Sequence, residues 1–175
     1  MKITKKETVY DGHYSLQVYT VQNGEQEFKR EVFHTGVAAA AIVFDTVKQQ
    51  FVFAKQYRAA LERELLEVVA GMLDSEDEKP EDAIIREIEE EIGYAVDKLE
   101  FIAEFHPSPG AVAEKNVLFY AEVSHKKSEG GGKADENESI QALYFSPESL
   151  RNHTFLDAKT LIAVQWAITH KLPKA

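Results

Sequence analysis

Hydrophobic and polar residues alternate along much of the first third of the chain. Residues 13–34 form two alternating segments around Asn23–Gly24, a pair that adopts positive φ at low cost and is typical of a tight hairpin turn. Segments 36–45 and 50–58 are more continuously apolar, which predicts strands buried on both faces. Residues 64–71 predict a further short strand. We therefore expect this part of the chain to be mainly β-sheet.

The pattern becomes helical after a polar loop. Residues 81–93 have helical spacing, and Pro80 suits the first turn because its missing N–H has no partner there. Gly93 is a plausible C-cap. Further on we predict strands at 98–107, 116–124 and 140–146, a mobile loop at 125–139 and an amphipathic helix at 157–170, with Phe155 and Trp166 as packing residues for this last helix. A mixed sheet with a few helices predicts an α/β or α+β sandwich.

Composition excludes several classes of protein. The chain has 175 residues, 44% of them hydrophobic, which is ordinary for one globular domain. A net charge of −10 disfavours a nucleic-acid partner, and no apolar run approaches the roughly 20 residues of a membrane span. The polar start is unlike a secretory signal, and the lack of cysteine excludes disulfides and thiolate metal sites. We expect a cytoplasmic protein.

Four glutamates occupy five consecutive positions between 87 and 91. On a helix that turns about 100° per residue, Glu90 lies about 60° to one side of Glu87 and Glu91 about 40° to the other. These three carboxylates therefore share one face, while Glu89 lies on the far side.

An apolar stripe of Ile85, Ile88 and Ile92 is expected beside this face and should point into the core. Two explanations of the carboxylates remain open from the geometry. They are either a charged surface with ion pairs, for which Arg86 is available, or a site for a divalent cation such as Mg²⁺ or Mn²⁺, which prefer hard oxygen ligands.

The segment from Gly71 to Tyr94 resembles the Nudix hydrolase signature, G-x5-E-x7-R-E-U-x-E-E-x-G-U, where U is a bulky aliphatic residue. The matching positions are Glu78, Arg86, Glu87, Ile88, Glu90, Glu91 and Gly93. The segment departs from the signature twice: six residues instead of five separate Gly71 from Glu78, and Tyr94 replaces the aliphatic residue. We expect the extra residue to be absorbed locally, so that neither departure touches the carboxylate face.

This resemblance implies that Glu87, Glu90 and Glu91 bind Mg²⁺ or Mn²⁺, two or three ions per site. The carbonyl group of Ala70 is a further implied ligand. Glu78 and Arg86 would organise the loop and helix around the ions, with Arg86 paired to a carboxylate. Metal ions neutralise a pyrophosphate, orient it and acidify a water for attack.

Three other stretches resemble the ADP-ribose pyrophosphatase branch of this family: QYRAALERELLEVVAG, HPSPGAVAEKNVLFYA and ADENESIQALYFSPESL. The second places Pro109 sixteen residues after Gly93, at the position of the proline that marks the branch. The resemblance implies hydrolysis of ADP-ribose to AMP and ribose 5-phosphate. It also implies that Glu136 or Glu138, on the predicted mobile loop, is the general base, and EGGGKA would give this loop its flexibility.

Candidate substrate contacts come from residue chemistry. Arg58 and Arg30 could bind pyrophosphate through paired hydrogen bonds, although each is equally consistent with a surface ion pair. Glu114 could bind ribose hydroxyls or help position metal, or be a turn residue. Phe28 or Phe33 could stack on adenine, or belong to the core or a dimer contact.

The resemblance implies a Nudix-type mixed β-sheet sandwiched between helices. Residues 1–35 would be an antiparallel β element that forms a homodimer, and residues 36–175 the Nudix domain. Two alternative functions remain: hydrolysis of another nucleoside diphosphate derivative, such as GDP-mannose, and a nucleotide-binding sensor without activity. The intact carboxylates disfavour the sensor.

Overall fold

The computed structural model describes residues 1–75, 77–132 and 139–173. Contacts divide the chain into two compact units. The first unit consists of Met1–Val37 and Phe105–Lys115, and the second of Ala38–Glu104 and Asn116–Ala175. The role in dimerisation that the sequence suggested for residues 1–35 stays a prediction.

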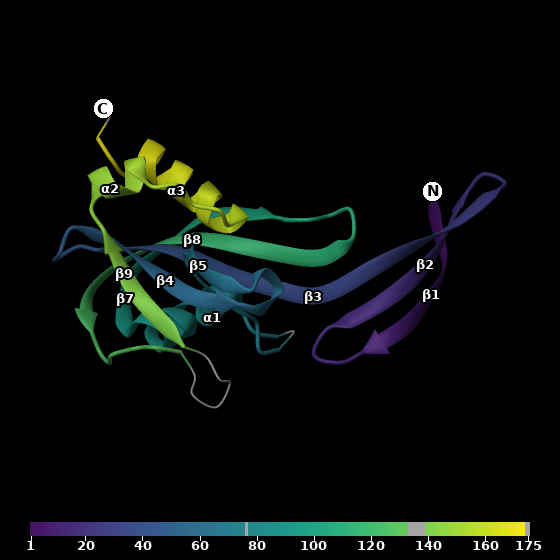
Figure 1. The fold of residues 1–175 in the computed structure, drawn as a ribbon, viewed down its shortest axis with the longest axis horizontal. Coiled ribbons are helices and arrows are strands. Elements are labelled where there is room, and N and C mark those ends of the chain that lie inside the picture. The colour runs from purple at the N-terminus through teal and green to yellow at the C-terminus, as the bar shows by residue number, and fades with distance from the viewer. Residues whose placement is uncertain (76, 133–138, 174–175) are drawn as a thin grey trace. The chain divides into compact units, whose positions relative to one another are not determined.

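The first unit is built on an antiparallel meander (Figure 1). Its strands are β1 (Lys2–Asp11), β2 (Ser15–Asn23) and the first part of β3 (Gln26–Asp45). Asn23 pairs with Gln26, and Gly24 has a φ of +62°, so the predicted hairpin turn is confirmed. The strand β1 was not singled out from the sequence, and all but one of its residues are exposed.

The strands that follow in the chain build most of the second unit. They are β4 (Gln50–Arg58), β5 (Arg63–Glu67), β6 (Val69–Met72), β7 (Tyr94–Phe105), β8 (Val112–Lys126) and β9 (Ile140–Phe145), with a 3₁₀ turn, η1 (Ala59–Leu61). β4 pairs antiparallel with β3, β5 and β9, and β6 pairs antiparallel with β3. β8 pairs with β3 and β7.

The core lies in the central strands of the second unit. Residues 38–43 of β3 and 51–54 of β4 are each at most 7% exposed, which confirms burial on both faces for the central residues of the predicted strands, whereas Gly36 and Tyr57 are exposed. The ring centroid of Phe53 lies 5.0 Å from that of Phe155, so the predicted packing of Phe155 is also confirmed.

Helices cover these strands (Figure 1). They are α1 (Pro80–Glu87), the π-helical turn η2 (Ile88–Ile92), α2 (Pro147–Asn152) and α3 (Ala158–His170). Pro80 opens α1 as predicted. Asp157 caps α3, because its Oδ2 accepts a hydrogen bond from the Thr160 N–H at 2.9 Å. Trp166 packs with its ring centroid 5.6 Å from that of Tyr120.

The short helix α2 was not predicted. Its signal is local, since Ser146 precedes Pro147 and its Oγ accepts a hydrogen bond from the Ser149 N–H at 3.1 Å. Within the described residues, no helix combines the length and apolar character needed to cross a membrane. A mixed sheet with a few helices confirms the predicted α+β fold class.

Candidate metal centre

Three glutamates share one face at the junction of α1 and η2. The carboxylates of Glu87 and Glu90 contact the same nitrogen, Nη1 of Arg86, at 2.6 and 3.2 Å. Glu91 is buried, with 5% of its surface exposed. Glu89 lies on the other side and binds Lys127 Nζ at 2.8 Å near the surface. Glu89 thus forms an exposed ion pair, whereas Glu87 and Glu90 share one guanidinium nitrogen.

The prediction that Ile85 belongs to the buried stripe is wrong. Ile84, Ile88 and Ile92 are fully buried, whereas Ile85 is 40% exposed. Residues four apart align on a helix, so Ile84 continues the row of Ile88 and Ile92 towards the start of α1. Ile85 lies at the edge of this row.

The prediction of a regular α-helix up to residue 93 needs a second correction. From Ile88 to Ile92 the chain is π-helical, and the Gly93 N–H bonds to both the Glu89 and the Ile88 carbonyl oxygens. Gly93 then ends the helix with a φ of +78°, as expected for a glycine C-cap. Wide π turns often occur at functional sites. Here the turn carries Glu90 and Glu91.

Arg86 connects the carboxylates to the preceding loop. Its guanidinium contacts carboxylates of Asp74, Glu78, Glu87 and Glu90, which together form the Arg86 cluster. Burial alone would lower the pKa of Arg86, but these carboxylates raise it above its ordinary value. The pairing predicted for Arg86 is therefore present in the structure.

Glu78 fixes the loop that enters α1. Its Oε2 accepts a hydrogen bond from the Asp74 N–H at 2.6 Å, and its Oε1 lies 3.4 Å from Arg86 Nε. A second guanidinium nitrogen, Nη2 of Arg86, donates to the Met72 carbonyl oxygen at 3.3 Å. The arrangement matches the organising role suggested for Glu78 and Arg86, and any catalytic role stays a prediction.

The strand β6 lies directly against the carboxylate face. A Cβ at Gly71 would overlap the carboxylate end of the Glu87 side chain, so a larger residue there requires that side chain to move. Ala70, the suggested carbonyl ligand, precedes Gly71 and pairs with Ala40 of β3. The sheet thus brings the Ala70 backbone close to Glu87.

The donor set suits a hard cation. Carboxylate and carbonyl oxygens are the ligands that Mg²⁺ and Mn²⁺ prefer. Within the described residues, no three acidic or histidine side chains already form a group that could hold a metal ion, because Glu87 and Glu90 are turned towards Arg86. The residues therefore fit such an ion by chemistry, and binding requires Glu87 and Glu90 to rotate away from the guanidinium.

A second ionic group lies near Glu91. Arg58 donates to both carboxylate oxygens of Glu67, from Nε at 2.6 Å and from Nη2 at 3.0 Å. Lys159 of α3 also binds Glu67 and lies 3.1 Å from Asp157. We call these four residues the Glu67 cluster. Neither Glu67 nor Lys159 was proposed as a site residue from the sequence, because 92 positions separate them, although Glu67 lies in the stretch QYRAALERELLEVVAG.

The Glu67 cluster also bears on the role predicted for Arg58. Hydrogen bonding to Glu67 raises the pKa of Arg58, and the charge of Glu91 raises it further, which places Arg58 within the field of the carboxylate face. A guanidinium has five N–H donors, and the bonds to Glu67 use two of them. Contact with a phosphate remains compatible with this geometry.

The first unit holds the other suggested substrate contacts. On β3, the Arg30 guanidinium carbon lies 4.4 Å from the ring centroid of Phe28, in a cation–π arrangement. Phe33 is 37% exposed. Glu114 accepts a hydrogen bond from Thr35 Oγ1 at 3.3 Å. Roles of these residues in substrate binding stay predictions.

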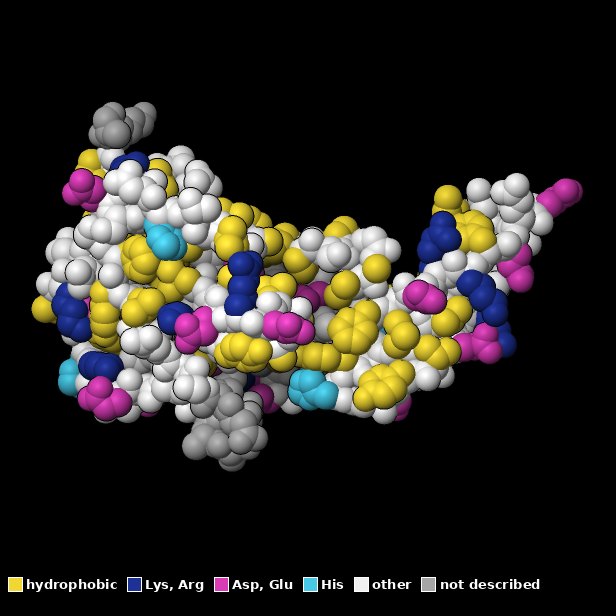
Figure 2. Space-filling view, viewed as in Figure 1, with side chains coloured by type: hydrophobic (Ala, Val, Ile, Leu, Met, Phe, Trp, Pro, Cys, Tyr) yellow, Lys and Arg dark blue, Asp and Glu magenta, His cyan; other side chains and the backbone are white. Residues whose placement is uncertain are grey.

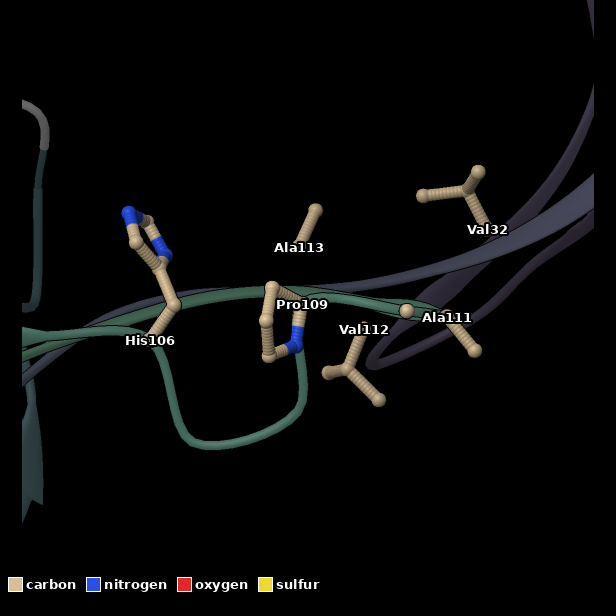
Figure 3. A pocket seen from close by; sticks show the side chains of 7 residues that line it. Val32, His106, Pro109, Ala111, Val112 and Ala113 are labelled. Carbon is tan, nitrogen blue, oxygen red and sulfur yellow. The ribbon is translucent and has the colours of Figure 1, made fainter.

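The Pro109 loop lines a pocket of about 280 Å³ in the first unit (Figure 3). Its lining consists of Val32, His106, Pro109, Gly110, Ala111, Val112 and Ala113. The Phe33 N–H binds the Ala111 carbonyl oxygen at 2.9 Å and holds the loop to β3. His106 Nδ1 lies 2.6 Å from the Glu114 carbonyl oxygen, a contact that the sequence did not indicate.

Glu136 and Glu138, the suggested general bases, lie outside the described residues. The glycines before them do not simply act as a flexible spacer. The N–H groups of Gly131 and Gly132 bind the carbonyl oxygens of Glu91 and Glu90, at 2.9 and 3.1 Å. The backbone at Gly131 and Gly132 is therefore bonded to the end of η2.

Comparison with known proteins places this geometry in a family. The family model of the NUDIX domain matches residues 34–166 of this chain. ADP-ribose pyrophosphatase from Escherichia coli K12 is 35% identical over 97% of this chain and 88% of its own length. GDP-mannose pyrophosphatase from Cronobacter sakazakii is 37% identical over 78% of this chain and 76% of its own length.

The fold agrees with this relationship. A crystal structure of an ADP compounds hydrolase superposes with a TM-score of 0.80, covering 97% of this chain and 95% of the other, at 18% identity. Matches of the domain, of nearly full-length relatives and of the fold agree with the signature between Gly71 and Tyr94. The chain therefore belongs to the Nudix hydrolase family.

Proposed function

We propose that this protein hydrolyses the pyrophosphate bond of ADP-ribose, with Mg²⁺ or Mn²⁺, to give AMP and ribose 5-phosphate. The observation that carries the proposal is that Glu87 and Glu90 share one nitrogen of Arg86 beside β6, with the buried Glu91 next in the chain. A relative named ADP-ribose pyrophosphatase, aligned over 97% of this chain, supports the substrate.

Each residue of the centre has a distinct part in this proposal. Glu87, Glu90, Glu91 and the Ala70 carbonyl group would hold two or three ions. Such ions, when bound, neutralise the pyrophosphate and acidify a water. Arg86 would keep Glu87 and Glu90 close together before metal binds, because its Nη1 contacts both.

The reaction forms a bond between the water oxygen and one phosphorus and breaks the bond from that phosphorus to the bridging oxygen. Glu136 or Glu138 would accept the water proton, and the bridging oxygen leaves on the other phosphate. Arg58 would bind pyrophosphate oxygens with its remaining N–H groups. Arg30, Glu114 and Phe28 are proposed to contact the rest of the substrate.

A second substrate has support of its own. The relative named GDP-mannose pyrophosphatase is 37% identical over the part that it matches. Hydrolysis of a nucleotide sugar would use the same carboxylates, since both substrates contain a pyrophosphate. The kcat/KM values for ADP-ribose and GDP-mannose, measured on one preparation with Mg²⁺, decide between them.

The role of the carboxylates is tested with a matched pair of variants on one helix. We expect Glu90→Gln to reduce Mg²⁺-dependent release of AMP at least 100-fold, in the range of lost transition-state charge stabilisation. Glu89→Gln, on the opposite side and paired with Lys127, should keep wild-type turnover. Equal activity of both variants would remove the metal role of Glu90. Tight binding of ADP-ribose by the wild type without any product would indicate a sensor instead.

We also propose a homodimer formed through the first unit. Nearly all of β1 is exposed, including Ile3, Val9 and Tyr10, and Figure 2 shows hydrophobic side chains over this unit. A small sheet with exposed apolar residues gains stability when a second copy covers it. Sedimentation at micromolar concentration should give about twice the 19.8 kDa chain mass. A monomer would contradict the proposal.

A further inference from the structure

The last carbonyl groups of a helix have no partners within the helix, so other groups must satisfy them. At the end of η2, the backbone of Gly131 and Gly132 supplies this cap. Their N–H groups donate to the carbonyl oxygens of Glu91 and Glu90, at 2.9 and 3.1 Å. Both capped residues are proposed metal ligands. The cap therefore acts on the backbone that carries their carboxylates.

The residues just before these glycines bind Gly93, the residue that ends η2. The carbonyl oxygen of Gly93 accepts hydrogen bonds from the N–H groups of Lys127, at 2.7 Å, and Ser128, at 3.2 Å. The chain leaving β8 thus binds the end of η2 just before it reaches the glycines. These bonds together fix three backbone positions of the turn.

Steric contact explains why glycine is required here. Gly130 has a φ of +70°, and a Cβ on it would overlap the Glu91 carbonyl oxygen and the backbone of Gly93. A Cβ on Gly93 would in turn overlap the Ser128 carbonyl oxygen. The two chain segments are therefore in direct backbone contact, which any larger residue at position 130 would disrupt.

The cap is also anchored to the sheet. The carbonyl oxygen of Gly131 accepts a hydrogen bond at 3.0 Å from the N–H of Ile140, the first residue of β9. β9 pairs with the central strand β4 from Ile140 to Phe145. The end of η2 is thus linked through Gly131 to the most buried part of the second unit.

We propose that Gly130–Gly132 is a positioning element that holds the backbone of Glu90 and Glu91 in the place from which their side chains reach the metal ions. The segment acts through the backbone of these two residues and does not itself contact the ions. This inference rests on the proposed metal-dependent function. It adds a determinant of metal affinity that lies outside the signature segment.

The test compares two glycines with nearly the same backbone conformation. Gly130→Ala adds a methyl group against η2, whereas Gly24→Ala adds one in the β2–β3 turn, where φ is +62° and nothing lies within 4 Å. Both substitutions carry the cost of a left-handed alanine, and only the first disturbs the cap.

We expect Gly130→Ala to weaken Mn²⁺ binding roughly 10-fold in calorimetry, as is typical when groups that orient metal ligands are altered. Gly24→Ala should bind Mn²⁺ like the wild type. Equal Mn²⁺ affinity of the two variants would overturn the proposal.

A second measurement uses the wild-type protein, in case Gly130→Ala does not fold. Mg²⁺ should slow hydrogen exchange of the Gly131 and Gly132 amides, because ordering Glu90 and Glu91 also orders the carbonyl groups that these amides bind. The Gly24 amide should be unaffected. Unchanged exchange at Gly131 and Gly132, with Mg²⁺ shown to bind, would refute the positioning role. Absence of any Mg²⁺ or Mn²⁺ binding by the wild type would instead refute the proposed function.

Discussion

The Glu67 cluster and the Arg86 cluster use the same side-chain chemistry with different charge balance, since the first has two carboxylates for two cations and the second has four for one. In the Glu67 cluster, one carboxylate that is 3% exposed lies between Arg58 and Lys159. In the Arg86 cluster, one guanidinium contacts four carboxylates. Both lie in the second unit, and Arg58 lies within the electrostatic influence of Glu91.

The difference separates a structural ion pair from a binding site. In the Glu67 cluster the carboxylates of Glu67 and Asp157 balance the charges of Arg58 and Lys159, and removing the buried charge of Glu67 leaves an excess of positive charge, which is costly. Several carboxylates around one cation repel one another, and a divalent cation relieves that repulsion. We therefore expect substitutions in the Glu67 cluster to affect mainly stability, and substitutions in the Arg86 cluster to affect mainly metal binding and turnover.

The largest effect on stability is expected for Glu67→Gln. The variant leaves Arg58 and Lys159 without their shared negative charge, which should lower the free energy of unfolding by about 3 kcal/mol. Urea denaturation measures this change. Glu100→Gln, which breaks the more exposed ion pair with Lys171, is the control and should have a much smaller effect. Similar losses in both variants would show that burial does not distinguish the pairs.

Lowering the pH should neutralise the Glu67 carboxylate gradually, as the substitution does at once. Burial alone would raise the pKa of Glu67, but Arg58 and Lys159 hold it below the ordinary value of 4.5. A carboxyl group whose pKa is lower in the folded state stabilises the fold above its unfolded pKa. This contribution is lost as the pH falls through the folded pKa. The free energy of unfolding should therefore decrease below about pH 4.5 more steeply in the wild type than in Glu67→Gln. If the free energies of unfolding of the two proteins fall in parallel with pH, Glu67 does not contribute the predicted pH-dependent stability.

A smaller effect, on activity instead of stability, is expected for Arg86→Lys. A lysine cannot contact Glu78, Glu87 and the Met72 carbonyl oxygen with a planar fork of donors. We expect kcat/KM to fall about 10-fold, equivalent to about 1.4 kcal/mol, with little change in melting temperature. Arg151→Lys, at a guanidinium that binds the Pro173 carbonyl oxygen, is the control. A large loss of stability with normal turnover would show that the Arg86 cluster is structural, contrary to this comparison.

The smallest effect concerns Tyr94, which departs from the Nudix signature. Its hydroxyl donates to Asp45 Oδ2 at 2.9 Å and accepts from Lys48 Nζ at 2.6 Å. Tyr94→Phe should therefore lower the free energy of unfolding by about 1 kcal/mol and leave Mn²⁺ affinity unchanged. Tyr57→Phe, at a side chain that is 60% exposed, should change neither quantity. Weaker Mn²⁺ binding in Tyr94→Phe would show that Tyr94 contributes to the metal centre.

Local periodicity was enough to predict much of the fold. The hairpin turn at Gly24, the strands buried on both faces and the start of α1 at Pro80 each follow from a few neighbouring residues. The error at Ile85 and the missed π turn arose because an ideal helical wheel ignores how η2 packs against the sheet. The Glu136 and Glu138 predictions lie in the part of the chain that the structure does not describe.

The sequence by itself determined the family signature and led to the prediction that Glu87, Glu90 and Glu91 share one face, because regular helix geometry fixes which side chains point the same way. Only the tertiary structure showed that Glu67 binds Lys159, that Gly71 makes room for Glu87, and that Gly131 and Gly132 cap η2. These contacts join positions far apart in the chain. Their energy depends on burial and on distances between elements, which no local pattern of residues records.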